Sequence, residues 1–344
     1  MTAIPFEFES KFNGRYGIVT RRMLRMLSED SRVALSEMSA KFGISRQAIK
    51  KRMTGMYGEL GITNTLALDE EKLGLANPHL ILVRFKRRPD RETLLHTFQR
   101  SYVPQLVVST HGEYDLLVYA NAASKSEYVR WDMGMHIVLA DYGMTWTSLE
   151  MTHRQLGFFP LRNEAIMKSA LPEKYKDMLV LLNSDSGITF REMASKLGMH
   201  INSAMYTYRK IVEQERYVKR FSIALRPLKG TAIIGFFCRY TPGPDHESNS
   251  SRARRAFMSD DKDPAVSRYL VCSQLIGGYD FFSMGVFDDE KAAYRMGVSY
   301  HRQCHGKNGL KMRHAYFDDV LLGTLPLYSI DTGKEYNAMR WEIN

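Results

Sequence analysis

The hydrophobic pattern of the chain begins with short helices. Apolar residues recur at helical spacing in three stretches, residues 20–28, 35–42 and 46–56. Ser36 and Ser45 are predicted to cap the second and third helices, and Gly43 provides the turn between them. The stretch 62–69 alternates apolar and polar residues, which predicts a strand. Two helices joined through glycine, then a third helix and a strand, are typical of a winged helix-turn-helix.

The pattern then changes to strands that alternate with helices. Strands are predicted at 79–87, 104–110, 114–121 and 144–152, with helices at 90–101 and 124–140. A second series has strands at 230–240, 266–275, 279–287 and 311–319, with helices near 250–258 and at 290–304. Each series has the order βαββαβ, which is the ferredoxin-like arrangement of two helices on an antiparallel sheet.

Three motifs occur twice, in the same order. Glu37–Gly43 recurs 155 residues later, Gly112–Asp115 recurs 165 residues later, and Leu156–Leu161 recurs 166 residues later. The added residues fall in 241–264, which is rich in Pro, Gly, Ser and Asp and is predicted to be a surface loop. The chain is therefore predicted to contain two copies of a unit of roughly 150 residues.

These patterns predict an α+β fold in which two winged helix-turn-helix modules alternate with two ferredoxin-like modules. The winged modules are predicted at 1–76 and 163–227, the ferredoxin-like modules at 77–162 and 228–328, and a tail at 329–344.

Charge supports this division, because the net charge of +10 is unevenly distributed. Residues 11–60 hold eleven Lys or Arg and four Asp or Glu, and residues 174–226 hold ten and five, while the other stretches are nearly neutral. Two basic blocks favour a polyanionic partner. Three widely spaced cysteines fit a reducing cytoplasm, and no apolar stretch is long enough for a transmembrane helix.

The third helix carries the strongest candidates for DNA contacts. Its polar face holds Ser45, Arg46, Gln47, Lys50, Lys51 and Arg52. Arg46 and Gln47 lie near the helix start, where side chains reach base edges, and the three later cations suit phosphates. The corresponding helix of the second copy is less basic, and its candidates are Asn202, Tyr206, Arg209 and Lys210. It is either a second DNA contact or an interaction surface.

With these residues in place, the chain resembles the Lrp/AsnC family of transcription regulators, present twice. Three segments carry the resemblance, namely ISRQAIKKRM, ALDEEKLGLANPHLILVRF and HGEYDLLVYA. The match covers residues 16–162 and, more loosely, 174–328. The second copy departs from the pattern at its junction, which lacks the acidic segment.

The resemblance implies ferredoxin-like modules that dimerise through their sheets and bind an amino acid near the interface. The implied pockets are Gly112, Glu113, Tyr114 and Asp115 in the first copy and Gly278, Tyr279 and Asp280 in the second. Alternatively, these residues only form tight turns. No cofactor is expected. His301, Cys304 and His305, with His314 further on, form a weak metal candidate, and no metal site is predicted.

The sequence leaves the pairing of the two copies open. Their sheets can pair within one chain as a pseudo-dimer, or like copies can pair between two chains. Further assembly into a homo-oligomer is expected in either case, because sheet edges need covering.

The predicted function is a cytoplasmic regulator that binds double-stranded DNA, and not an enzyme. One alternative is an enzyme resembling the siroheme decarboxylases of haem biosynthesis, which share the fused architecture. Their arginine–proline–tyrosine–asparagine stretch with a histidine is not found here. A second alternative is an architectural protein that binds DNA with little sequence preference.

Overall fold

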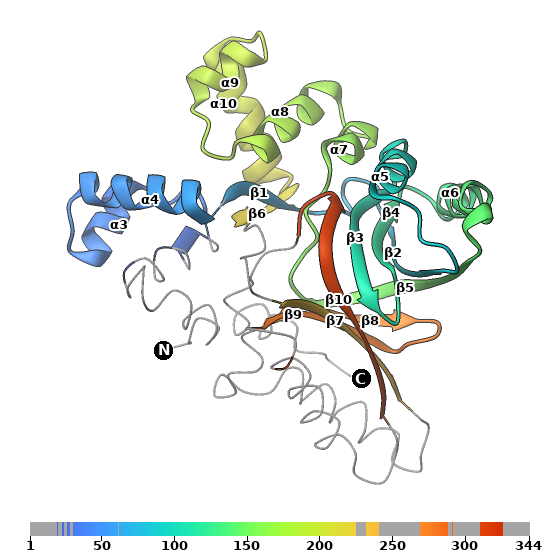
Figure 1. Cartoon of the computed structure of the whole chain (residues 1–344). Coiled ribbons are helices and arrows are strands. Elements are labelled where there is room, and N and C mark those ends of the chain that lie inside the picture. The colour runs from blue at the N-terminus through green and yellow to red at the C-terminus, as the bar shows by residue number, and fades with distance from the viewer. Residues whose placement is uncertain are drawn as a thin grey trace, which may run out of the picture.

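The protein is described by a computed structural model as a barrel that carries two helical heads on one side (Figure 1). The description covers residues 30–60, 62–224, 232–240, 269–287 and 310–325, together with Val19, Met23, Met26, Leu27 and Lys291. The predicted loop 241–264, the helices near 250–258 and 290–304, and the tail lie outside these residues.

The first head consists of helical positions around Met23 and Leu27 followed by α3 (Leu35–Phe42) and α4 (Arg46–Leu60). Gly43 ends α3 with a φ of 65°, a conformation that glycine adopts without a steric penalty. The Ser45 hydroxyl accepts a hydrogen bond from Ala48 N at 3.2 Å, so the predicted cap of α4 is confirmed. The predicted cap at Ser36 is wrong, because α3 begins one residue earlier and Ser36 lies inside it.

The second head consists of four helices and a short π-helical turn, namely α7 (Asn163–Lys168), α8 (Glu173–Ser184), α9 (Phe190–Lys196), α10 (Ile201–Arg209) and η2 (Lys210–Gln214). Thr189 and Glu192 form a capping box at the start of α9, which fixes where that helix begins. Met178, Leu182 and Met193 are buried in the core of this head.

The two heads exchange their wing strands. Strand β1 (Thr63–Leu68) follows the first head, β6 (Val218–Ala224) follows the second, and the two strands pair antiparallel in a two-stranded ribbon. Leu66 of β1 packs into the core of the second head, while Ile223 of β6 belongs to the cluster that contains the first head's core. Each wing also keeps contacts with its own head, through Asn64 with Tyr57 and through Phe221 with Tyr208.

Eight strands of the described chain close into a barrel, in the order β10-β3-β4-β2-β5-β8-β9-β7. They are β2 (Asn77–Phe85), β3 (Pro104–Gly112), β4 (Leu116–Ala122), β5 (Met144–Leu156), β7 (Ala232–Tyr240), β8 (Tyr269–Ile276), β9 (Phe281–Phe287) and β10 (Leu310–Leu322). All neighbours are antiparallel, so alternate side chains point inward.

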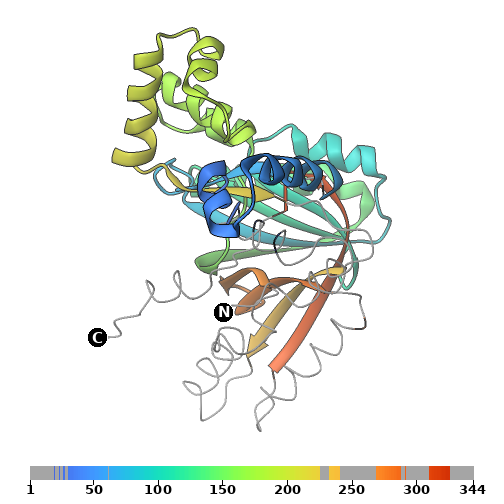
Figure 2. The ribbon, with the colours of Figure 1, turned by 90° about the vertical axis from the view of Figure 1, so that its left-hand side faces the viewer.

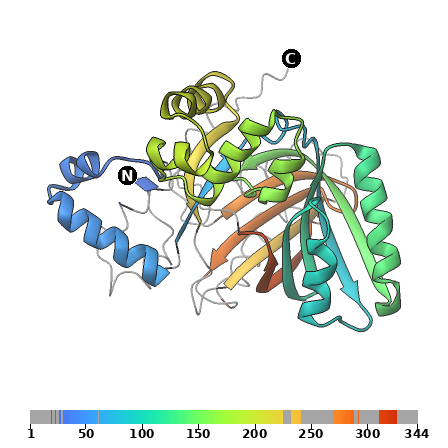
Figure 3. The same cartoon turned by 90° about the horizontal axis from the view of Figure 1, so that it is seen from above.

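The outer face of the first four strands is covered by helices. Helices α5 (Arg91–Gln99) and α6 (Lys125–Val138) bury Phe98 and Trp131 against outward-facing residues such as Val107 and Val118, and a short 3-10 helix, η1 (Ala140–Tyr142), follows α6. Figure 3 shows both helices lying along the same side of the barrel. Residues 77–156 form β2, α5, β3, β4, α6 and β5 along the chain, which is the predicted βαββαβ order.

The barrel closes within one chain, which resolves the pairing that the sequence leaves open. Strand β3 pairs with β10, and β5 pairs with β8, so each seam joins strands that lie more than a hundred residues apart. Two views at right angles show the heads on the same side of this barrel (Figures 1 and 2).

The mixed α+β class is confirmed, while the division into four modules stays a prediction. No helix among the described residues is both long enough and apolar enough to cross a membrane.

One turn depends on a very close backbone approach. A Cβ added to Gly323 would lie 2.0 Å from the carbonyl oxygen of Gln105, and Gly323 has a φ of +80°. We expect Gly323→Ala to lower the free energy of unfolding by about 2 kcal/mol or more, in addition to the cost of placing alanine in a left-handed backbone conformation. The added Cβ forces the segments at Gly323 and Gln105 to move apart.

Gly74→Ala is the matched control, since Gly74 has a φ of +78° and open space around it. Urea unfolding of both variants measures the difference. Equal losses of stability would contradict the close approach.

Candidate functional site

Two turns predicted to bind an effector meet at one end of the barrel. Tyr114 follows β3 and Tyr279 follows β8, and their hydroxyls hydrogen-bond to each other. Both rings lie on Phe237, with centroids 5.9 Å and 5.5 Å from it. Gly112 and Gly278 lie in the same turns and are exposed. The structure therefore brings the two predicted pockets together at a single place.

Asp115 stabilises its turn through its side chain and its backbone. Its carboxylate accepts a hydrogen bond from Phe85 N at 2.7 Å, and its own N–H donates to Val83 O at 2.8 Å. Asp280 occupies the equivalent place, with its N–H donating to Cys238 O at 2.9 Å. The contact of the Asp115 carboxylate favours the turn-forming alternative for this residue over binding of an amino group.

Strand β10 brings Arg313 to this site and His314 to the outer face of the same strand, and the sequence associated neither residue with the site. Arg313 forms an ion pair with Glu113, and this hydrogen bond raises the pKa of the guanidinium. His314 is half-buried, and burial lowers the pKa of its imidazole below the usual value, so the neutral form dominates at pH 7. These residues lie about 200 positions from the turn, and no local pattern identifies them.

Ion pairs also cross the outside of the β3–β10 seam. His111 contacts Asp318 at 2.5 Å and stacks on Tyr316, with ring centroids 5.1 Å apart. Arg91 pairs with Asp319 at 2.8 Å. These side chains are about half exposed, so each pair contributes less than about 1 kcal/mol to stability.

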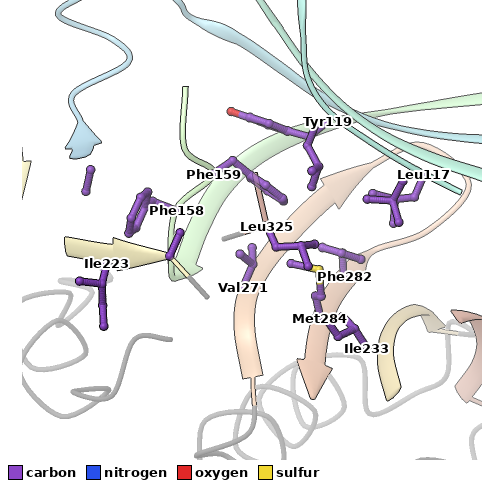
Figure 4. Packing of buried hydrophobic residues seen from close by; sticks show 14 of the residues in the cluster. Leu117, Tyr119, Phe158, Phe159, Ile223, Ile233, Val271, Phe282, Met284 and Leu325 are labelled. Carbon is purple, nitrogen blue, oxygen red and sulfur yellow. The ribbon is translucent and has the colours of Figure 1, made fainter. Parts of the chain in front are cut away.

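The interior of the barrel is filled by side chains. Phe237, Phe282 and Leu117 are fully buried, and Tyr119 stacks on Phe159 at 4.0 Å (Figure 4). An eight-stranded barrel is just wide enough for such packing.

The opposite end of the barrel holds a buried polar cluster. The Glu70 carboxylate accepts hydrogen bonds from the Tyr119 hydroxyl at 2.6 Å and from Asn121 Nδ2 at 2.5 Å. Glu70 belongs to the segment after β1, so this cluster attaches the ribbon to the barrel.

The barrel end with the tyrosine pair offers the chemical groups needed for a carboxylate substrate. Arg313 can bind a carboxylate in place of Glu113. Burial raises the pKa of Tyr114, which keeps its hydroxyl protonated as a proton donor at neutral pH. His314 lies on the other face of β10, where it packs edge-on against Tyr316 with ring centroids 5.0 Å apart.

The predicted DNA-binding residues of the first head lie on its solvent face. Ser45, Arg46, Gln47, Lys50, Lys51 and Arg52 are all exposed. Within the described part of the chain, the four cations among them form no ion pair. Ile49 and Met56, on the opposite face of α4, are fully or almost fully buried. The charge of α4 is thus presented to solvent.

The second head presents a different surface. Asn202, Tyr206 and Arg209 on α10 are exposed, whereas the hydrogen bond of Lys210 to Tyr175 raises the pKa of its ammonium group. Tyr208 faces the first head. The surface of α10 therefore carries one exposed cation where α4 carries four.

The weak metal candidate stays untested. His301, Cys304 and His305 lie outside the described residues, and His314 lies at the barrel end. Among the residues with a described position, no group of His, Cys, Asp or Glu is arranged to hold a metal ion.

Comparison with solved structures shows that the whole fold is similar to that of an enzyme. The siroheme decarboxylase NirDL matches with a TM-score of 0.53 and 12% identity, over 93% of this chain and 96% of NirDL. NirDL in co-complex with an iron-uroporphyrin III analogue matches with the same score and identity, over 93% and 95%. At this identity the likeness shows the fold alone.

Regulators of the Lrp/AsnC family match part of the chain. LrpC from B. subtilis is 20% identical with a TM-score of 0.34, over 39% of this chain and 94% of LrpC. An AsnC family regulator from Agrobacterium tumefaciens is 20% identical with the same score, over 40% and 90%. TM-scores of 0.34 support no conclusion about the fold or function of this chain. No family model matches the sequence, and no curated protein matches it.

The expectation that the chain is not an enzyme is wrong, because the fold that matches over 93% of its length is an enzyme fold. The absence of the arginine–proline–tyrosine–asparagine stretch does not exclude that fold.

Proposed function

We propose that the chain is an enzyme that binds a carboxylate-bearing tetrapyrrole at the barrel end beside Tyr114 and Tyr279 and removes carboxyl groups from it. The observation that carries the proposal is the agreement with a siroheme decarboxylase over both heads and the barrel. Arg313 and Tyr114 provide a carboxylate anchor and a proton-transfer group at one place.

The chemistry needs no oxidant. The bond between a side-chain carbon and its carboxylate breaks, CO2 leaves, and the electron pair left on the carbon takes up a proton. Arg313 would hold a neighbouring carboxylate of the substrate. Tyr114, hydrogen-bonded to Tyr279, would deliver the proton, and solvent at the exposed turns would restore it.

The test of this proposal is a titration with iron-uroporphyrin III followed by absorbance, with siroheme turnover measured by mass spectrometry as loss of CO2. We expect binding by the native chain and about tenfold weaker binding by Arg313→Ala, because a charge-assisted contact is lost. We expect Tyr114→Phe to slow turnover while binding is unchanged.

Arg91→Ala is the control, since Arg91 forms a similar ion pair outside the seam. An unchanged absorbance spectrum of iron-uroporphyrin on addition of the native chain would contradict the proposal.

Tandem duplication is part of the proposal. Ser31 and Ser186 are 155 residues apart, the offset of the repeated helical motif, and their hydroxyls lie 2.9 Å apart. Leu66 pairs with Phe221, again 155 residues away, and Tyr114 with Tyr279 at the offset of 165. Equivalent positions that touch each other mark an axis relating two copies. The domain limits predicted from the sequence follow from such a duplication.

A second function, DNA binding by the first head, is favoured by the cations of α4, which form no ion pair with any residue whose position is described. Lys50, Lys51 and Arg52 are exposed on one short helix whose opposite face is buried. A surface of this kind binds phosphates through release of counterions. Neither this function nor the enzymatic one excludes the other, since they use different ends of the molecule.

We expect Lys50→Ala combined with Lys51→Ala to weaken binding to every duplex. The slope of log affinity against log salt should fall by about 1.8 units, the value for two phosphate contacts. Electrophoretic shifts at several salt concentrations measure this slope. The control is Lys125→Ala combined with Lys311→Ala, which removes the same charge from exposed positions of α6 and β10. This control should leave the slope unchanged. The same change of slope in both double variants would show that α4 is not the binding surface.

A further inference from the structure

Helix α6 carries apolar side chains on two opposite faces. Its inner face, which includes Trp131, is buried against the barrel. On its outer face Val129, Met133 and Ile137 have exposed fractions of 45%, 60% and 75%. Because these three residues, which we call the α6 stripe, are spaced four apart, they form one row along the helix. A helix that is apolar all round is normally covered on both faces.

Exposed apolar side chains elsewhere in the described part of the chain form no such row. They are distributed over α7, α10 and β8, and they are Met167, Ile201, Tyr206 and Ile276. Single exposed apolar residues are common on protein surfaces, whereas a contiguous set indicates an interaction site. The α6 stripe is therefore a candidate contact surface.

The repeated unit does not require apolar residues at the stripe positions. Lys125 and Tyr128 of α6 recur 166 residues later, which is the offset of the repeated Leu156–Leu161 motif. Under the proposed duplication, the stripe positions of the second copy are occupied by polar residues, namely Arg295, Ser299 and Gln303. The apolar stripe is thus a property of the first copy and needs its own explanation.

The closed barrel restricts how a second chain can bind. Every barrel strand is paired on both sides within one chain, so the barrel offers no free edge for strand addition. Assembly through barrel edges, which the sequence suggested, is therefore not available. Helix α6 lies on the side of the barrel away from the first head, and its outer face points away from the molecule (Figures 1 and 3).

The α6 stripe is complementary to a second copy of itself. In an antiparallel pair of helices centred on Met133, Val129 of one chain lies opposite Ile137 of the other, and Met133 lies opposite its own copy. Lys125 precedes the stripe by four residues and Asp141 follows it by four, and both are exposed. The same arrangement places these opposite charges toward each other at both ends. Rows of residues four apart form ridges that pack into the grooves of an identical helix.

We propose that two chains of this protein pair through the α6 stripe, antiparallel about a twofold axis at Met133. One helix face per chain is a small contact, so the dimer should dissociate on dilution. Pairing at α6 leaves the basic face of α4 exposed. The inference depends neither on the proposed decarboxylation nor on DNA binding.

The first experiment is analytical ultracentrifugation of the full-length chain over a range of concentrations. We expect a monomer–dimer equilibrium. A triple variant takes the residues of the second copy, Val129→Arg, Met133→Ser and Ile137→Gln. It should raise the Kd of the dimer about a hundredfold or more, because apolar burial is lost in both chains.

The control removes three exposed apolar side chains outside the stripe. Met167→Ser, Ile201→Gln and Tyr206→Arg, combined in the second head, should leave the Kd unchanged. Thermal unfolding of both triple variants checks that the fold is intact.

The second experiment tests the antiparallel arrangement by disulfide formation with diamide as oxidant. Met133→Cys should give a covalent dimer, because position 133 meets its own copy on the axis. Lys125→Cys should not, because the two copies of position 125 lie about 24 Å apart along the helices. The native chain shows how much its own cysteines contribute.

Four outcomes would overturn the inference. A native chain that is monomeric at every concentration excludes the dimer, and a dimer that survives the stripe variant uses another surface. Equal covalent dimer from Met133→Cys and Lys125→Cys excludes the antiparallel axis. A monomeric Met133→Cys variant whose thiol resists alkylation would show that another segment of the same chain covers the stripe.

Discussion

The structure depends on closure of the barrel between strands from the two halves of one chain. The first four strands leave β3 and β5 as edges, and these edges pair with β10 and β8 of the second half. Closure satisfies the backbone groups of four edges and buries two inner faces against each other. The tyrosine pair meets only because this closure occurs, and strand β10 of the second half holds Arg313 beside it.

The sequence predicted the features that depend on local patterns. The helices of the first head, the cap at Ser45 and most barrel strands follow from spacing and turn residues, and observed bounds differ by a few positions. The exchange of β1 and β6 could not be predicted, because either wing satisfies the same alternating pattern. Arg313 was missed for a similar reason, since strand register across two halves decides its neighbours.

The hydrophobic core links the first head to the barrel more closely than it links the second. Met38 and Ile49 belong to one continuous cluster with Leu80 and Phe282 of the barrel, whereas the second head has a cluster of its own. Packing inside the barrel therefore contributes to the stability of the head that carries the basic helix. The proposed substrate site and the proposed DNA surface are joined through this cluster.

Under the proposed duplication, two halves in one chain also change what a mutation does. In a symmetric dimer every substitution occurs in both subunits, so residues on the axis must be compatible with their own copies. Here Arg32 of the first half contacts Tyr208 of the second half. The second half has no equivalent arginine to make the same contact in return, because the residue 155 positions after Arg32 is Gly187. Each half can thus acquire changes that the other half never experiences, and a single gene can evolve two unlike partners that are always made in equal amounts.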